Sequence, residues 1–418
     1  MDFGLFCLMN KRSTTQTVHD ILSQTSEQVQ AAEKAGFKTA WFAEHHFSNY
    51  SLTPSPLLMV ANMAAITTKI QLGTGVLVLP LYHPARLLAE IGIADQMAQG
   101  RLVLGIGSGY QPFEFERFGL KLEEAKDRTL EMLEIIEGGL TQPEVSFNGK
   151  YIRQAETQIN VHPVENRMPD IWIAGGAPDL LLKAANKNYT PIITGRLFGP
   201  EFLVSQKEYC SQFWAQSGKD PAKMKFATLG AAHVCDSKAE AEEFAENLRF
   251  QSRLAFQLRH RTEVLEDGML VERPVDNELS LDEIVENLIV GDAQTCAEKC
   301  LDIIRRVKPV HMALYFTIGN ISHTRAMKSI ETFGSRYGTT IVCSRVFSPF
   351  WISSITPVRL KFRPPYRYPS TQMSTFGLIC LNLSITVPIP NSGEQIDQTA
   401  PILEVAKKHT TVSRILGM

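Results

Sequence analysis

The sequence predicts a closed (β/α)8 TIM barrel, in which eight parallel strands alternate with helices around one core. Short apolar runs and longer amphipathic segments alternate along residues 1–335 at intervals of about 30 residues, which is the spacing of βα units. Eight such apolar runs occur, and eight parallel strands favour a closed barrel over an open doubly wound sheet.

Each expected strand is a short run of aliphatic, β-branched or aromatic residues. The second run, 39–43, is rich in aromatic side chains. The third, 70–80, contains two glycines, which within a strand mark a bulge or a place where a ligand approaches the backbone. The expected strands are 3–9, 39–43, 70–80, 102–107, 170–174, 190–194, 225–234 and 311–316.

The expected helices lie between these runs. Gly36 and Gly100 follow the first and third helical patterns, where glycine commonly ends a helix. The expected helices are 18–35, 56–68, 84–99, 123–137, 179–187, 201–216, a segment from 237, 293–306 and 324–333. Residues 138–168 form a polar excursion, and the mixed-charge segment 255–283 breaks the alternation and is interpreted as an insertion.

The pattern changes from about residue 335. Residues 341–418 hold 8 of the 22 prolines and many Ser and Thr, with no sustained periodicity until 400–416. We therefore expect one barrel domain at 1–335 and an appended C-terminal extension, 336–418, that is poorly ordered rather than a second domain.

The composition is that of a globular protein with a sizeable core, since 44% of its 418 residues are hydrophobic and 21% charged. A formal net charge of −2 gives no reason to expect nucleic acid or an acidic membrane surface as partner. No apolar run is long enough to span a membrane, and no secretory signal opens the chain. Seven scattered cysteines without a CxxC pair fit a reduced, cytoplasmic protein.

Glu44, His45 and His46 end the second expected strand. Because side chains alternate along a strand, Glu44 and His46 should face one way and His45 the other. Polar groups at the end of a buried strand are costly unless they are paired or used, so a structurally satisfied histidine pair and an active site are equally good interpretations. A metal site is disfavoured because adjacent residues point apart and no third ligand follows at a useful spacing.

Two glycine-rich turns follow the fourth and fifth expected strands, at 105–110 and 174–179. Strand-to-helix turns of this kind offer backbone N–H groups to a phosphate. The first is not the dinucleotide fingerprint, because its glycine spacing is wrong. Each turn alone is a weak signal, but the two together on one face favour a phosphorylated cofactor, which Arg128 could reach.

These residues resemble the bacterial luciferase-like family of flavin-dependent monooxygenases. The similarity spans roughly residues 1–335, and the tail has no counterpart in it. The matching stretches are Met1-Asp2-Phe3-Gly4, Ala43-Glu44-His45-His46-Phe47, Leu72-Gly73-Thr74-Gly75-Val76-Leu77-Val78-Leu79-Pro80, His83-Pro84-Ala85-Arg86, Asp95-Gln96-Met97, Gly100-Arg101-Leu102, Phe118-Gly119 and Ile171-Trp172-Ile173-Ala174-Gly175-Gly176.

The resemblance implies a (β/α)8 barrel that binds reduced FMN at its mouth. Reduced flavin reacts with O2 to give a flavin hydroperoxide, which oxygenates a small organic substrate. His45 matches the histidine held near the flavin and important for catalysis, and Glu44 would orient it or help to shape the site. The strand at Thr74, Gly75 and Val76 matches one whose relatives carry a non-proline cis peptide under the isoalloxazine ring; here the bond is Gly75–Val76.

The implied phosphate contacts come from two turns and one helix. Luciferase itself has an arginine at the position of Ser108 and a Glu-Ser pair at Gly175 and Gly176, which argues against a luciferase and for more backbone contacts. The implied cofactor-binding residues are Thr74, Gly75, Val76, Gly107, Ser108, Arg128, Ala174, Gly175 and Gly176. Segment 255–283 matches the place of a mobile loop over the active site.

The resemblance further implies a separate NAD(P)H-dependent flavin reductase as a possible partner, and a homodimer packed through 56–68 and 84–99. Two alternatives stay open: a deazaflavin-dependent oxidoreductase of the same fold, and a non-catalytic flavin-binding subunit. Apolar side chains near the expected mouth indicate a small apolar organic substrate; these are Phe6, Leu8, Trp41, Tyr110 and Phe113.

Overall fold

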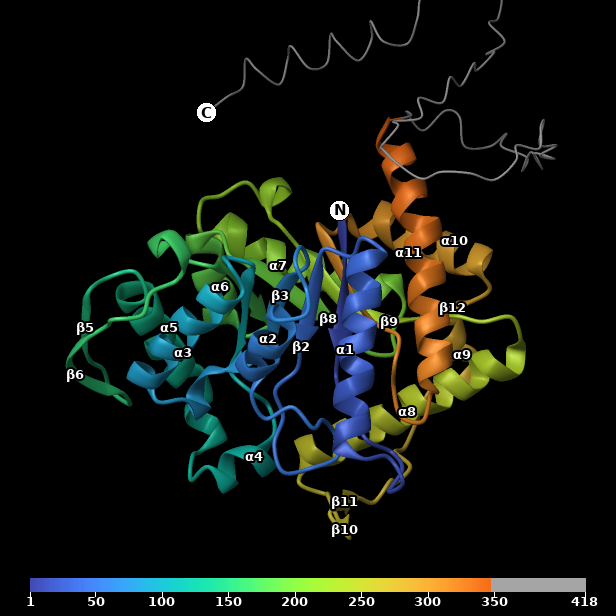
Figure 1. The fold of residues 1–418 in the computed structure, drawn as a ribbon, viewed down its shortest axis with the longest axis horizontal. Helices are drawn as coiled ribbons and strands as arrows, with labels where there is room; N and C mark the ends of the chain where they lie inside the picture. Colours follow the sequence, from blue (N-terminus) through green and yellow to red (C-terminus); the bar gives the residue numbers. More distant parts are fainter. Residues whose placement is uncertain (347–418) are drawn as a thin grey trace, which may run out of the picture. The chain divides into compact units, whose positions relative to one another are not determined.

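The computed structural model describes residues 1–346 and, for side chains, residues 1–334. Eight parallel strands form a closed barrel, because β13 pairs with both β1 and β9, and β9 also pairs with β8 (Figure 1). This confirms the predicted fold. The barrel strands are β1 (Asp2–Cys7), β2 (Thr39–Phe42), β3 (Gln71–Val78), β4 (Leu102–Gly107), β7 (Asp170–Ala174), β8 (Thr190–Thr194), β9 (Ala227–Val234) and β13 (His311–Tyr315).

Helices connect consecutive barrel strands. Most begin at a side-chain cap or a proline, as at α1, where Thr17 and Asp20 form a capping box. The helices are α1 (Val18–Lys34), α2 (Pro56–Ala64), α3 (Pro84–Met97), α4 (Pro112–Arg117), α5 (Ala125–Gly139), α6 (Pro178–Lys187), α7 (Pro200–Gln216), α8 (Lys238–His260), α9 (Leu281–Asn287), α10 (Ala293–Val307) and α11 (His323–Val346). Short 3₁₀ turns are η1 (Leu79–Leu81), η2 (Leu122–Glu124), η3 (Val164–Asn166) and η4 (Pro221–Lys223).

Several elements differ from the expectation. The polar excursion 138–168 contains an antiparallel hairpin, β5 (Glu144–Asn148) and β6 (Arg153–Gln158). The expected helix 56–68 ends at Ala64, because the Glu33 carboxylate of α1 accepts hydrogen bonds from three consecutive backbone N–H groups, those of residues 68, 69 and 70, and so turns the chain toward β3.

The predicted insertion 255–283 begins within a helix, since buried side chains continue to the end of α8. Short strands β10 (Leu265–Glu266) and β11 (Met269–Leu270) follow, and β12 (Ile289–Gly291) extends β9 outside the ring. Helix α11 runs to Val346, beyond the expected domain end at 335. The expectation of a poorly ordered tail falls mostly on residues 347–418, which lie outside the described part of the chain.

The barrel interior is filled by an aromatic cluster. Trp41 of β2 packs on Trp172 of β7 with ring centroids 4.9 Å apart, and its Nε1–H donates to His311 Nε2 of β13 at 3.0 Å. Glycines on the neighbouring strands make room for it: a Cβ at Gly73 would collide with the Trp41 ring, and one at Gly4 with His311. Of the two glycines in β3, Gly73 therefore makes room for the Trp41 ring, and Gly75 lies nearer the mouth.

Burial lowers the pKa of His311 from 6.5 to about 3, so its imidazole is neutral in the folded protein. In the unfolded chain it binds a proton below about pH 6.5, so protonation favours unfolding as the pH falls from there toward 3. We expect His311 to remove about 2 kcal/mol of stability between pH 7 and pH 5.

Urea unfolding of the wild type and of His311→Gln, which keeps an acceptor for Trp41, measures this difference. The variant should lose correspondingly less stability over that interval. His233, whose pKa burial also lowers, contributes equally to both proteins. Equal losses in the two proteins would contradict the assignment.

Candidate functional site

The carboxyl ends of the barrel strands form one face of the molecule, and side chains that serve a ligand are expected there. In Figure 1, α4, α8 and the β10–β11 hairpin lie together below the barrel strands. The loop after β2 reaches this side, where the His46 backbone N–H donates to the Glu114 carboxylate of α4 at 2.7 Å. The mouth is therefore covered by elements from distant parts of the chain.

Glu44 and His46 form one buried pair, with His46 Nε2 3.1 Å from Glu44 Oε1. The other oxygen of Glu44 accepts from the Val78 backbone N–H at 3.0 Å and from the Tyr82 hydroxyl at 2.7 Å. Burial raises the pKa of Glu44, and these hydrogen bonds oppose the rise. Glu44 thus joins the end of β2 to the end of β3 and makes no hydrogen bond to His45.

His45 faces the other way, as strand alternation predicts. Its Nδ1 lies 3.1 Å from Glu114 Oε1 and 3.3 Å from Gln111 Nε2. Because a carboxylate accepts a hydrogen bond, Nδ1 carries the proton and Nε2 is left as the basic nitrogen. Nε2 has no hydrogen-bond partner among the described residues, so it is free to exchange a proton with a ligand.

Two tyrosines enclose the His45 ring. Its centroid lies 4.6 Å from that of Tyr50 and 5.9 Å from that of Tyr110, both edge-on. The Tyr110 hydroxyl donates to the Tyr50 hydroxyl at 3.0 Å and accepts from Gln111 Nε2 at 3.1 Å. Burial raises the pKa of both phenols, which are therefore neutral at neutral pH.

Glu114, Tyr50 and Gln111 are site residues that sequence reasoning missed, and Glu114 is the most important of them. It is 1% exposed and binds both the His45 ring and the His46 backbone. A signal was present: Glu114 stands between Phe113 and Phe115 in a short helix after a glycine-rich strand end, and a carboxylate between two buried aromatics needs a partner. Its partner lies 69 residues away, which no local pattern reveals.

The predicted residues of β3 and β4 lie side by side in the sheet. The Gly75–Val76 peptide bond is cis, as the family resemblance implies, and both residues are partly accessible. The Thr74 hydroxyl, in contrast, is buried and donates to the Gly105 carbonyl at 2.8 Å. Gly107 is buried beside Val76, where a Cβ would meet the valine side chain at 3.0 Å.

The predicted phosphate residues follow the neighbouring strands β4 and β7. Ser108 is partly exposed, and Ala174 is followed by the exposed Gly175 and Gly176. Gly175 has φ +101°, and nothing lies within 4 Å of where its Cβ would be. No side chain caps the first turn of α6, so its backbone N–H groups are open to an anion.

Arg128 makes a different contact from the one predicted. Its Nε and Nη2 both donate to Glu124 Oε2 of the preceding turn, at 3.0 and 2.8 Å, and its guanidinium lies over the Tyr151 ring. The structure therefore brings the ends of β3, β4 and β7 together. The Arg128 guanidinium is instead paired with the Glu124 carboxylate.

Residues 262–279, which we call the strap, connect α8 to α9. The strap turns back on itself at Asp267 and Gly268, both with positive φ, and so forms the β10–β11 hairpin. The Leu270 backbone N–H donates to Asn49 Oδ1 at 2.8 Å. The strap is thus attached to the loop that carries His45 and Tyr50.

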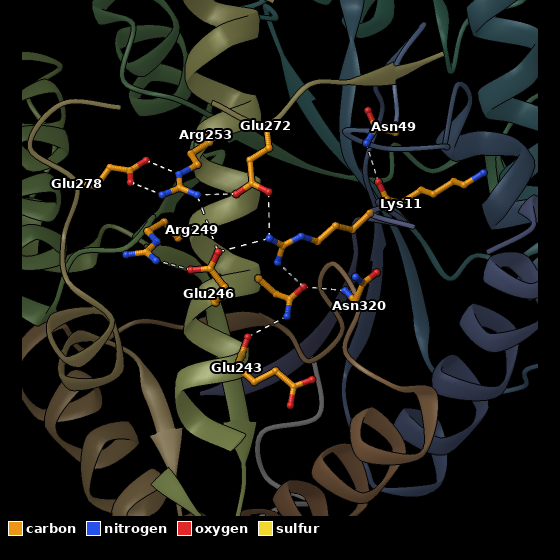
Figure 2. A network of polar contacts seen from close by, with 11 residues as sticks. Lys11, Asn49, Glu243, Glu246, Arg249, Arg253, Glu272, Glu278 and Asn320 are labelled. Atoms are coloured by element: carbon orange, nitrogen blue, oxygen red, sulfur yellow. Dashed lines mark hydrogen bonds and ion pairs between the residues drawn. The ribbon is translucent and has the colours of Figure 1, made fainter. Parts of the chain in front are cut away.

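Ion pairs hold the strap to α8 and to the loop after β1. Arg253 lies between Glu278, at 2.7 and 2.6 Å, and Glu272, at 2.7 Å (Figure 2). Arg12 reaches Glu272 from the other side at 3.0 Å. Glu272 of the strap is therefore shared between two arginines, while Glu278 pairs with Arg253 alone, and such partly buried networks are stronger than isolated surface pairs.

We expect Arg253→Gln to loosen the strap without unfolding the barrel. Loss of these charge-assisted hydrogen bonds should speed tryptic cleavage at Arg273, which lies within the strap, by about tenfold, because opening becomes roughly 1.4 kcal/mol easier. High salt should speed wild-type cleavage at the same site. Arg306→Gln on α10, which removes an exposed pair with Glu201 of α7, is the control and should leave this cleavage unchanged.

None of the helices within residues 1–346 is both long and apolar enough to cross a membrane. Nor does the described part of the chain bring together three or more His, Cys, Asp or Glu side chains in an arrangement that could hold a metal ion.

Comparison with known proteins identifies the relatives of this chain. The profile of the luciferase-like monooxygenases matches residues 1–307. An uncharacterised protein of Sinorhizobium fredii is 39% identical over 337 residues, which are 80% of this chain and 96% of that protein. The oxygenase component of a flavin-dependent trigonelline monooxygenase from Acinetobacter baylyi is 29% identical over 59% of this chain and 69% of its own length.

Solved structures share the fold at lower identity. The oxygenating constituent of 3,6-diketocamphane monooxygenase from Pseudomonas putida, solved with FMN, has a TM-score of 0.66 and 21% identity over 80% of this chain and 97% of its own. An F420-dependent secondary alcohol dehydrogenase has a TM-score of 0.63 and 18% identity over the same shares.

Proposed function

Because the chain belongs to the luciferase-like monooxygenase family, we propose that it is an FMN-dependent monooxygenase. It uses reduced FMN and O2 to transfer one oxygen atom to a small organic substrate, while the other oxygen atom leaves as water. The observation that carries this proposal is the Glu114–His45 pair, which leaves His45 Nε2 without a partner among the described residues and stands after β2, the strand that pairs with the one carrying the accessible Gly75–Val76 backbone.

The residues present fit FMN. The accessible Gly75–Val76 backbone suits the flat ring system, and the open N–H groups around Ser108, Gly175 and Gly176 suit the phosphate, with Gly107 and Ala174 alongside. Arg128 binds the phosphate only if its guanidinium leaves the Glu124 carboxylate. Thr74 contributes through its backbone and not through its hydroxyl, because the hydroxyl already donates to the Gly105 carbonyl.

Reduced FMN, when bound, supplies the two electrons by which O2 is divided between product and water. The chain supplies proton control and water exclusion. Glu114 holds the Nδ1 proton of His45, so that Nε2 can accept or return a proton at the mouth. The strap and the two tyrosines limit the access of bulk water, which favours oxygen transfer over loss of peroxide.

The proposal includes partners. Reduced FMN comes from a separate NAD(P)H-dependent reductase, a division of labour suggested by the relative that is an oxygenase component. A homodimer through α2 and α3 is supported by apolar side chains that these segments expose, including Leu58 at 70% and Met97 at 52%. The five cysteines within residues 1–334 are free and buried, which suits a reducing cytoplasm.

The test supplies the full chain with FMN, NADH, a flavin reductase and O2, together with a panel of small acids, aldehydes and ketones. We expect FMN to bind, as measured by quenching of flavin fluorescence. We also expect O2 uptake that yields oxygenated product rather than H2O2. Hydride transfer with F420 and no O2 uptake would identify the deazaflavin alternative. FMN binding without turnover of any panel member would favour the non-catalytic subunit.

We expect His45→Gln to lower product formation by about 10²- to 10⁴-fold, because a positioned acid–base group contributes that much. Its FMN affinity should stay within about threefold, because a Gln side chain does not alter the open phosphate turns. The control is His323→Gln on α11, whose ring pairs with Glu27 of α1 rather than with Glu114. Unchanged turnover in His45→Gln would remove His45 from the mechanism.

We expect Glu114→Ala to lower turnover by about 10- to 100-fold, because it leaves the His45 Nδ1–H and the buried His46 N–H without an acceptor. Glu114→Gln keeps one oxygen acceptor and should retain more activity than Glu114→Ala. Glu116→Gln, an exposed change two residues further on, is the matched control. Equal activity in the Ala and Gln variants would argue against a hydrogen-bonding role.

A further inference from the structure

The last turn of α8 brings a cation to the wall of the candidate site. The guanidinium carbon of Arg259 lies 4.5 Å from the centroid of the Tyr110 ring, in a cation–π contact. Tyr110 also contacts the His45 ring and donates to Tyr50. Arg259 is thus one aromatic ring away from the imidazole proposed for catalysis.

The charge of Arg259 has no carboxylate partner among the described residues. Three neighbouring arginines have partners: Arg261 pairs with Glu116 at 2.8 Å, Arg117 donates to the Phe113 carbonyl at 2.9 Å, and Arg253 pairs with Glu272 and Glu278. Glu114, the buried carboxylate of the site, is occupied by His45 and His46. The donors of Arg259 are therefore available.

An arginine near a helix end is often only a solvated charge that favours the helix dipole. Two observations oppose that reading. The Arg259 guanidinium lies over Tyr110 and makes no hydrogen bond to the last carbonyls of α8 among the described contacts. Its charge also acts on the buried site, since burial raises the pKa of Tyr50 and Arg259 is among the groups that oppose the rise.

We propose that Arg259 binds the carboxylate of the substrate, so that the substrate is a small organic acid with an apolar body. Arg259 is exposed, and its guanidinium offers two parallel N–H groups that match a carboxylate while it stacks on the face of Tyr110. The apolar body packs against rings that face the mouth, those of Tyr50 and Tyr110, with Phe6 and Tyr315 deeper in the barrel.

This inference rests on the proposed function, and it is tested by binding, separately from turnover. Isothermal titration of the full chain, with and without FMN, compares two pairs of probes that differ in charge: benzoate with benzamide, and octanoate with octanamide. We expect at least one acid to bind about tenfold or more tightly than its amide, as a charge-assisted hydrogen bond predicts.

Arg259→Gln should abolish that preference while leaving amide binding within about twofold, and Arg259→Lys should keep part of it. Arg261→Gln, which removes a neighbouring arginine already paired with Glu116, is the control and should keep the whole preference. Equal binding of acids and amides, or a preference that survives Arg259→Gln, would overturn the inference. Failure of FMN to bind would count against the proposed function alone. The inference about Arg259 would still be tested, because the acids and amides are also titrated without FMN.

Discussion

The arrangement at the mouth depends on one buried carboxylate. Glu114 of α4 accepts from the backbone of His46 at 2.7 Å and from the His45 ring at 3.1 Å, and so fixes both the path of the loop after β2 and the direction of the imidazole. A carboxylate that is 1% exposed needs such donors, because desolvation without them is costly. The requirement of Glu114 for donors and the requirement of His45 for an orienting acceptor are met by the same bonds.

Glu44 is a second buried carboxylate that needs hydrogen-bond donors, and it lies on the opposite face of the chain at the end of β2. Its two oxygens accept from His46, Val78 and Tyr82, so the end of β2 is tied to the strand that carries the cis peptide bond. The two adjacent imidazole rings thus have different carboxylate partners, Glu114 for His45 and Glu44 for His46, while the His46 backbone N–H also donates to Glu114.

The barrel was predictable because parallel strands buried on both faces leave near-continuous apolar runs, and the opposed directions of His45 and His46 follow from strand alternation. Contacts between distant segments were not predictable. Glu114 resembles the other charges of a short helix, and its partner His45 lies 69 residues away. The Arg128 pair is a different case, because Glu124 lies four residues before it at the spacing of a helical ion pair and was open to prediction. The hairpin at β5 and β6 escaped notice because its strands are mostly exposed and polar, and lack an apolar run.

The strap and the catalytic candidate are connected by a short chain of contacts. Leu270 of the strap donates to Asn49, whose neighbour Tyr50 packs edge-on against His45 and is held at its carbonyl by Gln251 of α8 at 3.2 Å. The arginines that hold the strap lie on α8 and in the loop after β1, so the strap joins three segments of the mouth. The contacts of the strap and the position of the His45 ring are therefore structurally linked through Asn49 and Tyr50.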